Sequence, residues 1–223
     1  MDLIKSYEFF APEKVCDPIH IIGCGSVGST VVENLARCGL TRFTLWDFDI
    51  VEEKNIVNQM FRSRDVGKPK VEALRDIITE INPDAVPNIK LMPAGWNGEP
   101  LSGYVFLAVD SIELRKKIVS VCNTAPDIKA VFDFRTSLTF AQHYAANWTS
   151  YKDRKQLMAS MDFTSEEAKE ETPVSACGTT LGVATTVRLI CALGVDNFIN
   201  FVKGEGLKKF VQINGFSFGL IAF

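Results

Sequence analysis

A glycine cluster between an apolar run and an amphipathic stretch restricts the fold of this chain most. Residues 18–22 (PIHII) predict a short buried strand, and Gly23-Cys24-Gly25-Ser26-Val27-Gly28 follows it directly. A helical pattern then continues to Gly39. Glycines at this spacing allow a tight turn, close approach of a phosphate to the backbone and close helix–strand packing. The start of the helix also offers unpaired amides to an anion.

The rest of the chain up to residue 135 alternates strands with helices. Strands are predicted at 42–46, 88–92, 104–109 and 129–134, and helices at 70–81 and around 114–121. This alternation indicates an α/β fold with a Rossmann-like, mostly parallel sheet and helices on both faces.

The regular alternation of predicted strands and helices ends after residue 135. An antiparallel strand is expected at 137–148, an exposed acidic helix or mobile loop at 151–172, a buried helix or subunit contact at 179–193, and one or two strands at 208–223. We therefore expect a single domain, 1–223. Its nucleotide-binding part is 1–135, and its extension, 136–223, holds the antiparallel strands, the acidic loop and the apolar helix.

Composition excludes several classes of function. The formal net charge is −3, so nothing favours general binding to nucleic acid or to an anionic membrane. No uninterrupted apolar run reaches the roughly 20 residues that span a bilayer, and residues 1–15 lack the pattern of a signal peptide. We expect a cytoplasmic protein. Six scattered cysteines without a CxxC pair, and only two histidines, argue against zinc.

Asp47 is the second indication of a nucleotide. It ends the predicted strand 42–46, about 20 residues after the glycines, where an acid accepts hydrogen bonds from ribose hydroxyls. Glycines and Asp47 suit NAD as well as ATP. An NAD-dependent oxidoreductase therefore stays open at this point.

Residues 47–76 carry a further polar block, which resembles the ThiF/MoeB/HesA family of adenylyltransferases, bacterial relatives of ubiquitin-activating enzymes. The family's D-x-D, N-x-x-R-Q and D-x-G-x-x-K elements correspond to Asp47-Phe48-Asp49, Asn55 to Gln59, and Asp65 to Lys70. A later acid, Asp110, is followed by Arg115 in the next helix, as in the family. The similarity is strong over residues 18–135 and weaker but consistent in order beyond them.

The resemblance implies that the chain binds ATP and Mg²⁺ and adenylates a carboxylate, releasing pyrophosphate. Two anions approach each other in that reaction, so the site needs cations and a metal more than a strong base. The resemblance assigns the nucleotide to Gly23, Gly25, Ser26, Gly28, Asp47, Asp49, Asn55, Gln59, Lys70 and Asp110, with Lys70 at the phosphates and Asp110 as the metal ligand. An NAD enzyme would leave Asn55, Gln59 and Lys70 without a role.

Two departures from the family leave a catalytically weak, partner-binding member open. Asn58 stands where the family has arginine, and Arg62 or Arg64 is a candidate to supply that charge. No arginine precedes Cys16, and Lys5 is a poor replacement for a planar guanidinium.

Two further residues are candidates for catalysis. Cys177, in PVSACGTTLGV, either takes the acyl group as a thioester or packs under the nucleotide. Arg135 either contacts the incoming carboxylate or forms a structural ion pair with Asp133.

The resemblance also implies partners. The acyl substrate would be the C-terminus of a ubiquitin-like or sulfur-carrier protein, or a peptide. The acidic balance disfavours the carboxylate of a modified tRNA base. Family members are usually homodimers, to which the apolar residues 181–193 could contribute.

Overall fold

The fold is built on one eight-stranded mixed sheet. The computed structural model describes residues 1–164, 166–167 and 181–223. The strands are β1 (Ile19–Ile22), β2 (Phe43–Trp46), β3 (Lys90–Met92), β4 (Gly103–Leu107), β5 (Ile128–Thr136), β6 (Phe140–Asn147), β7 (Phe210–Asn214) and β8 (Gly219–Ala222). Their order in the sheet is β3-β2-β1-β4-β5-β6-β7-β8. The expected α/β class with antiparallel strands in the C-terminal part is confirmed.

The direction of the strands places the ligand crevice. β1 pairs in parallel with β2 on one side and with β4 on the other. The chain adds β2 and β3 on one side of β1 and then crosses to add β4 on the other side, so the strand order reverses at β1. The carboxyl ends of β1, β2 and β4 meet at this point. Ligands of open α/β sheets bind at such a point. From β5 onward the pairing is antiparallel.

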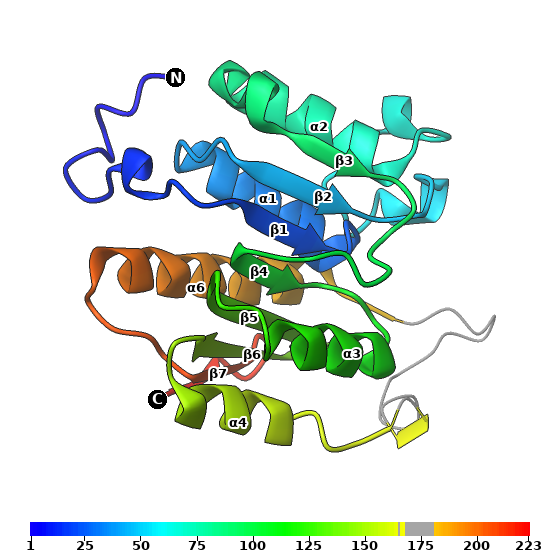
Figure 1. Ribbon diagram of the computed structural model, residues 1–223. Coiled ribbons are helices and arrows are strands. Elements are labelled where there is room, and N and C mark those ends of the chain that lie inside the picture. The colour runs from blue at the N-terminus through cyan, green and yellow to red at the C-terminus, as the bar shows by residue number, and fades with distance from the viewer. Residues whose placement is uncertain (165, 168–180) are drawn as a thin grey trace.

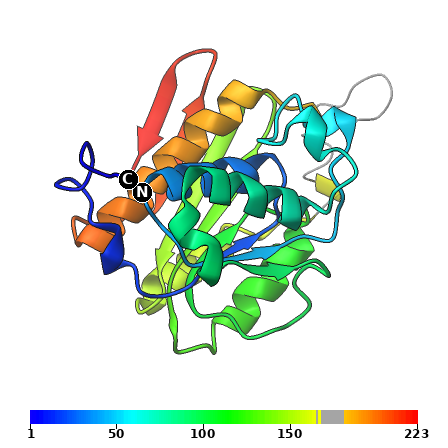
Figure 2. The same cartoon turned by 90° about the horizontal axis from the view of Figure 1, so that it is seen from above.

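Helices cover both faces of the sheet (Figures 1 and 2). One face packs α1 (Ser26–Arg37), α2 (Lys70–Ile81) and α6 (Ala184–Lys203), and the other packs α3 (Ile112–Cys122) and α4 (Tyr151–Ala159). Short 3-10 turns lie at Pro12–Lys14, Glu53–Asn55, Ser63–Asp65 and Pro83–Asn88. Neighbouring strand residues alternate between the two cores. Phe132 packs in the first and Val131 in the second, as the pleat requires.

The apolar C-terminal helix is longer than the sequence pattern predicts. α6 runs from Ala184 to Lys203 and ends at Gly204, whose φ of +77° suits a residue without a side chain. Asn197 interrupts the apolar pattern, yet it is buried, because its amide donates to the Lys208 carbonyl at 2.8 Å and contacts His143 Nε2 at 3.1 Å. The predicted end near residue 193 is therefore wrong. α6 is long and apolar enough to cross a bilayer, but half of that window is buried within the fold.

The acidic stretch after β6 begins as a helix. α4 takes residues 151–159, and Ser150 caps it by accepting from the Asp153 amide at 3.3 Å. Asp153 and Leu157 are buried under it, so α4 is attached to the sheet rather than free. The remainder of the predicted stretch lies largely outside the described residues.

Candidate functional site

The glycine turn is shaped by two close backbone approaches. Gly23 has a φ of +94°, and a Cβ there would lie 2.7 Å from the Ala108 carbonyl oxygen at the end of β4. A Cβ on Gly28 would lie 1.9 Å from the Gly23 carbonyl oxygen, so α1 approaches the turn as only glycine allows. A Cβ on Gly25 would instead meet nothing within 4 Å. Two glycines thus set the packing, and Gly25 leaves open space over the turn.

The start of α1 is free to bind an anion. Gly25 is its N-cap, so no side chain caps the helix, and its first turn contains no acidic residue. The amides and the positive end of the helix dipole therefore remain available at the open space beside Gly25. Ser26 is the first helical residue, and its carbonyl accepts from the Thr30 hydroxyl at 2.7 Å.

Asp47 closes the turn from the end of β2. Its carboxylate accepts from the Cys24 amide at 2.6 Å and from the Asp49 amide at 2.8 Å. Burial raises the pKa of Asp47, and these amides together with Lys70 oppose the rise. Two carboxylate oxygens have about four acceptor sites, so the side chain can still accept from ribose hydroxyls.

Lys70 lies at the base of the same site. Its Nζ is 2.7 Å from Asp49 Oδ2, and its side chain is 8 % exposed against 51 % for Asp49. The Lys70 amide also donates to the Asp49 carbonyl at 2.9 Å, which ties the start of α2 to the end of β2. Burial raises the pKa of both Asp47 and Cys24, and the positive charge of nearby Lys70 opposes that rise.

The segment from Asn55 to Gln59 is fastened to α1. The Met60 amide donates to Ser29 Oγ at 3.1 Å, and the buried Asn55 accepts from the Glu52 amide at 2.8 Å. Gln59 Oε1 is buried without a hydrogen-bond partner in the described part of the chain. Sequence reasoning missed Ser29, although a small polar residue on the buried face of a helix, next to Gly28, was a usable signal.

Asp110 stands at the open side of this arrangement. The Ala108 amide donates to the Ile22 carbonyl at 2.8 Å, which holds the end of β4 against the end of β1. Asp110 follows two residues later and is exposed. Among the residues that the structure describes, no three His, Cys, Asp or Glu side chains gather as a metal cage. A single free carboxylate nevertheless fits Mg²⁺, which proteins often hold through one or two carboxylates together with substrate phosphates.

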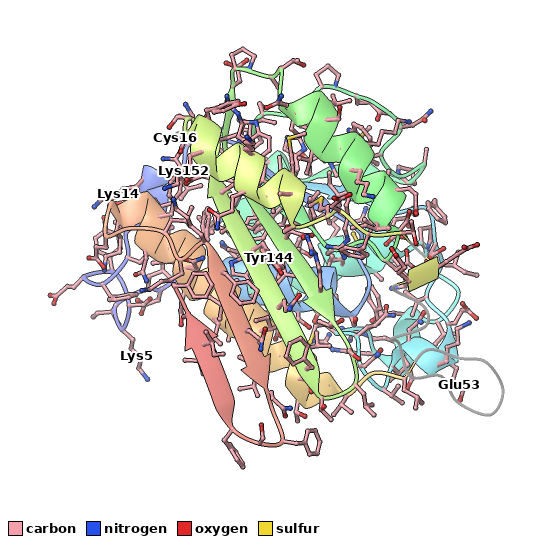
Figure 3. The ribbon with its side chains drawn as sticks, turned by 90° about the horizontal axis from the view of Figure 1, so that it is seen from below. Lys5, Lys14, Cys16, Glu53, Tyr144 and Lys152 are labelled. Atoms are coloured by element: carbon pink, nitrogen blue, oxygen red, sulfur yellow. The ribbon has the colours of Figure 1, made fainter. Side chains whose placement is uncertain are left out.

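Arg135 is held in a buried network on the α4 side of the sheet. Asp133, which is 0 % exposed, accepts from Arg135 Nε at 2.8 Å and from Arg115. Arg135 also donates to the Ser160 carbonyl at 2.7 Å, and its guanidinium carbon lies 4.3 Å from the ring centroid of Tyr144, labelled on β6 in Figure 3. The structural ion pair is therefore present, and contact with a carboxylate substrate stays a prediction.

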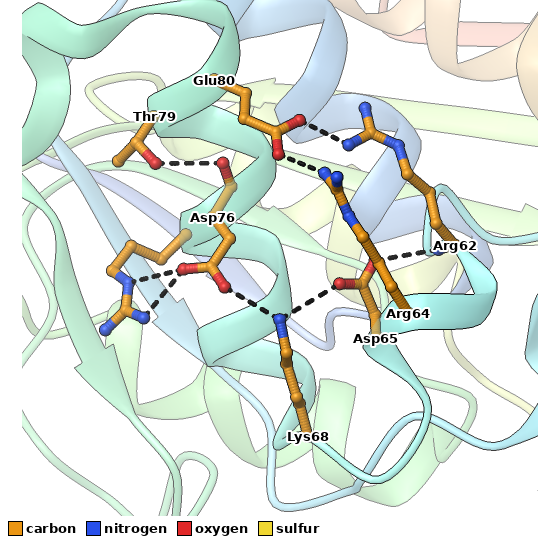
Figure 4. A network of polar contacts seen from close by, with 8 residues as sticks. Arg62, Arg64, Asp65, Lys68, Asp76, Thr79 and Glu80 are labelled. Atoms are coloured by element: carbon orange, nitrogen blue, oxygen red, sulfur yellow. Dashed lines mark hydrogen bonds and ion pairs between the residues drawn. The ribbon is translucent and has the colours of Figure 1, made fainter.

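Arg62 is directed away from the other candidates. Arg62 and Arg64 both donate to Glu80, near the far end of α2, while Lys68 lies 3.4 Å from Asp65 Oδ1 and 3.2 Å from an Asp76 oxygen (Figure 4). Glu80 follows Lys70 by ten residues of helix, or about 15 Å along its axis. The structure therefore does not bring Arg62 to the glycine turn.

The cysteines separate into packed and accessible thiols. Cys24, Cys122 and Cys191 are buried, and burial raises the pKa of all three. Cys16 is exposed, and Cys38 is half-buried. Cys177, the candidate for a covalent intermediate, lies outside the described residues.

Known proteins share both sequence and fold with this chain. Ubiquitin-like modifier-activating enzyme 5 of Caenorhabditis briggsae is 32 % identical over 138 residues, which are 55 % of this chain and 31 % of that protein. The Arabidopsis thaliana enzyme of the same name is 40 % identical over 86 residues, or 39 % of this chain and 19 % of that one. The chain thus matches less than a third of the length of these curated relatives.

Solved structures of low sequence identity have the same fold. E. coli MccB with MccA-N7isoASN superposes with a TM-score of 0.75 at 17 % identity, covering 95 % of this chain and 66 % of that one. E. coli MccB with ATP gives 0.71 at 17 % identity over 95 % and 65 %. PaaA gives 0.70 at 17 % identity over 95 % and 65 %.

Asp47 contacts the glycine turn at residues 23–28, and Lys70 pairs with Asp49 beside it, while Asp65 and Lys68 of the third motif pair with each other away from the turn. The model of the ThiF family matches residues 17–221, which is most of the chain. This chain is a member of the ThiF family.

Proposed function

We propose that this chain is an ATP-dependent adenylyltransferase that activates the C-terminal carboxylate of a ubiquitin-like or sulfur-carrier protein, or of a peptide. The relatives named as ubiquitin-like modifier-activating enzymes support the activating role. One observation carries the proposal. Open space over Gly25 lies at the uncapped start of α1, Asp47 at the end of β2 accepts from the turn, and Lys70 at the start of α2 pairs with Asp49.

The reaction joins two anions, and these residues offset their charge. A substrate carboxylate oxygen forms a bond to the α-phosphorus of ATP while the bond from that phosphorus to the β-bridging oxygen breaks, giving an acyl-adenylate and pyrophosphate. The α1 amides and Lys70 stabilise the negative charge that grows on the phosphate oxygens. Asp47 orients the ribose. Mg²⁺ held by Asp110 would neutralise further phosphate charge.

Two features of the site fit ATP better than NAD. Lys70 is a buried amine that pairs with Asp49 just beyond β2, and a dinucleotide pyrophosphate is bound by the glycine turn and helix start without such a lysine. Gln59 Oε1 is buried and has no hydrogen-bond partner among the described residues, so it can accept a hydrogen bond from a ligand.

Lys70→Met tests the proposal, with Lys68→Met as the matched control. Both changes keep the aliphatic stem and remove one amine, but the Lys68 side chain is 41 % exposed and pairs with Asp65 and Asp76 outside the site. ATP, and not NAD, should raise the melting temperature of the wild type. ATP–pyrophosphate exchange with candidate carrier proteins should be lost in Lys70→Met and kept in Lys68→Met.

Two results would count against this function. Stabilisation by NAD alone would favour the oxidoreductase, and undiminished exchange in Lys70→Met would remove the lysine from the mechanism. Nucleotide binding without exchange, whichever carrier is added, would favour a partner-binding role. Asn58, in place of the family's arginine, is the specific observation behind that second candidate.

We also propose a cytoplasmic homodimer. Leu181 and Leu189 are 37 % and 49 % exposed beside the buried face of α6, and they could form part of a subunit contact. Sedimentation of the wild type against Leu189→Glu tests this, since a charge in a dimer contact should shift the protein toward the monomer.

A further inference from the structure

We propose that Arg115 is a positioning residue that fixes the carboxyl end of β4 and so orients Asp110 toward the nucleotide. The inference rests on the proposed function. It concerns a side chain that lies in the core, on α3, and is only 6 % exposed.

Arg115 fastens two strands through one guanidinium. Its Nη1 donates to Asp133 Oδ1 and, at 2.7 Å, to the Phe134 carbonyl, both on β5. Its Nη2 donates to the carbonyl of Val109, the residue immediately before Asp110. The guanidinium therefore links the Asp110 loop to the neighbouring strand.

The Asp110 loop needs this support because β4 has already ended. The last paired residue of β4 is Leu107, opposite Asp133, so Val109 lies beyond the ladder. On its other side, Ser111 caps α3 by accepting from the Leu114 amide at 3.1 Å. Asp110 thus lies between two fixed backbone points. No hydrogen bond within the described residues holds its carboxylate, so the region that the carboxylate can reach is set by where the backbone places the Asp110 Cβ.

Asp133 in turn holds Arg115 in place. Its buried carboxylate lies between two guanidinium groups, those of Arg115 and Arg135. A planar guanidinium can serve an oxygen on Asp133 and the Val109 carbonyl at the same time, whereas a lysine ammonium is a compact point donor. Arg115→Lys should therefore keep the positive charge but lose the simultaneous hydrogen bonds to Asp133 and to the Val109 carbonyl.

Titration with ATP, with and without Mg²⁺, tests the proposal on the full chain. In the wild type, Mg²⁺ should tighten ATP binding, and Asp110→Asn should abolish that gain. Arg115→Lys should reduce the gain about tenfold, the lower end of the usual loss when the support of a metal ligand is removed. Its Kd for metal-free ATP should stay within about twofold of wild type, since residues at the glycine turn and Lys70 are unchanged.

Two further measurements separate positioning from general damage. The double variant Asp110→Asn/Arg115→Lys should behave as Asp110→Asn alone, because both changes act through one carboxylate. Amide hydrogen exchange in the nucleotide-free protein should accelerate at residues 108–111 in Arg115→Lys and stay unchanged at 19–22. Lys117→Gln, an exposed change on the same helix, should match the wild type in every assay.

The outcomes distinguish this inference from the proposed function. If the wild type binds no ATP, the proposed function and this inference both fall. If Asp110→Asn keeps the Mg²⁺ gain, this inference falls and the proposed function stands. Suppose that the wild type and Asp110→Asn behave as expected. If Arg115→Lys then keeps the full Mg²⁺ gain in ATP affinity, or loses affinity for metal-free ATP as much as for Mg·ATP, only the role of Arg115 is overturned. Should Arg115→Lys not fold, Asp133→Asn replaces it. That variant should show a smaller loss of the gain, and an unchanged gain would overturn the proposal.

Discussion

Gly28 and Gly25 lie three residues apart, and alanine at each should have opposite consequences. An added Cβ on Gly28 would lie 1.9 Å from the Gly23 carbonyl oxygen, and such contacts stay above 3.0 Å in real proteins. Either α1 or the turn must therefore move by roughly 1 Å. Overpacking of this kind typically costs about 3 kcal/mol at its upper end. At about 2–4 °C per kcal/mol for a chain of this size, the melting temperature should fall by about 6–12 °C.

Gly25→Ala should leave the fold intact and remove the ligand. Its Cβ would meet nothing within 4 Å, so the added methyl group should cause no steric overlap with the rest of the fold. The new methyl group would occupy the space over the turn where a phosphate approaches the backbone. ATP affinity should therefore fall at least about tenfold, equivalent to 1.4 kcal/mol.

Thermal unfolding without nucleotide and calorimetric titration with ATP measure the two effects separately. The reasoning fails if Gly28→Ala melts with the wild type, because the close approach of α1 to the turn would then be absent. It also fails if Gly25→Ala binds ATP with unchanged affinity, because the nucleotide would then not cross the open face of the turn.

Three further expectations follow from buried or paired groups. Burial lowers the pKa of His20 and His143 to about 4, below the unfolded value of 6.5, so both imidazoles favour the folded state above pH 6.5 and lose that contribution as the pH falls toward 4. Urea unfolding should show about 4 kcal/mol less stability at pH 5.0 than at 7.5, and His20→Gln should halve the difference. Glu80→Gln should leave the melting temperature and the ATP affinity almost unchanged, because its pairs with Arg62 and Arg64 in Figure 4 are exposed. A loss of ATP binding would place these arginines at the nucleotide. Gly194→Ala, normally stabilising within a helix, should instead cost about 1–3 kcal/mol because its Cβ would lie 2.3 Å from the Phe134 ring, and an unchanged midpoint in urea would contradict that packing.

The parts of the site that follow strand ends could be predicted from sequence. Gly23 and Asp47 come directly after apolar runs, and parallel strands bring their carboxyl ends to one edge. Residues 70–81 form the predicted helix without a change of boundary, since their apolar positions recur at a helical period and proline precedes them.

Partners that depend on three-dimensional packing could not be predicted. The position of Arg62 in the sequence does not show that it pairs with Glu80. Which acidic residue it reaches depends on how the loop before α2 turns. Likewise, Arg115 and Asp133 are 18 residues apart and meet only because β5 lies beside β4. The second half of α6 could not be predicted because Asn197 interrupts its apolar pattern. A polar residue in such a pattern indicates the end of a helix unless its buried hydrogen-bond partners are known.

The packing of α6 on α1 affects how the chain folds during synthesis. The Cys191 thiol contacts the Val27 carbonyl, across 164 positions in sequence. At about 5–20 residues per second, a ribosome needs roughly 10–30 s to make the intervening chain. Throughout that time the apolar side of α1 has no native cover from α6. The glycine turn and α1 are therefore translated well before the helix that completes their packing, and they reach their final packing only after α6 has been made.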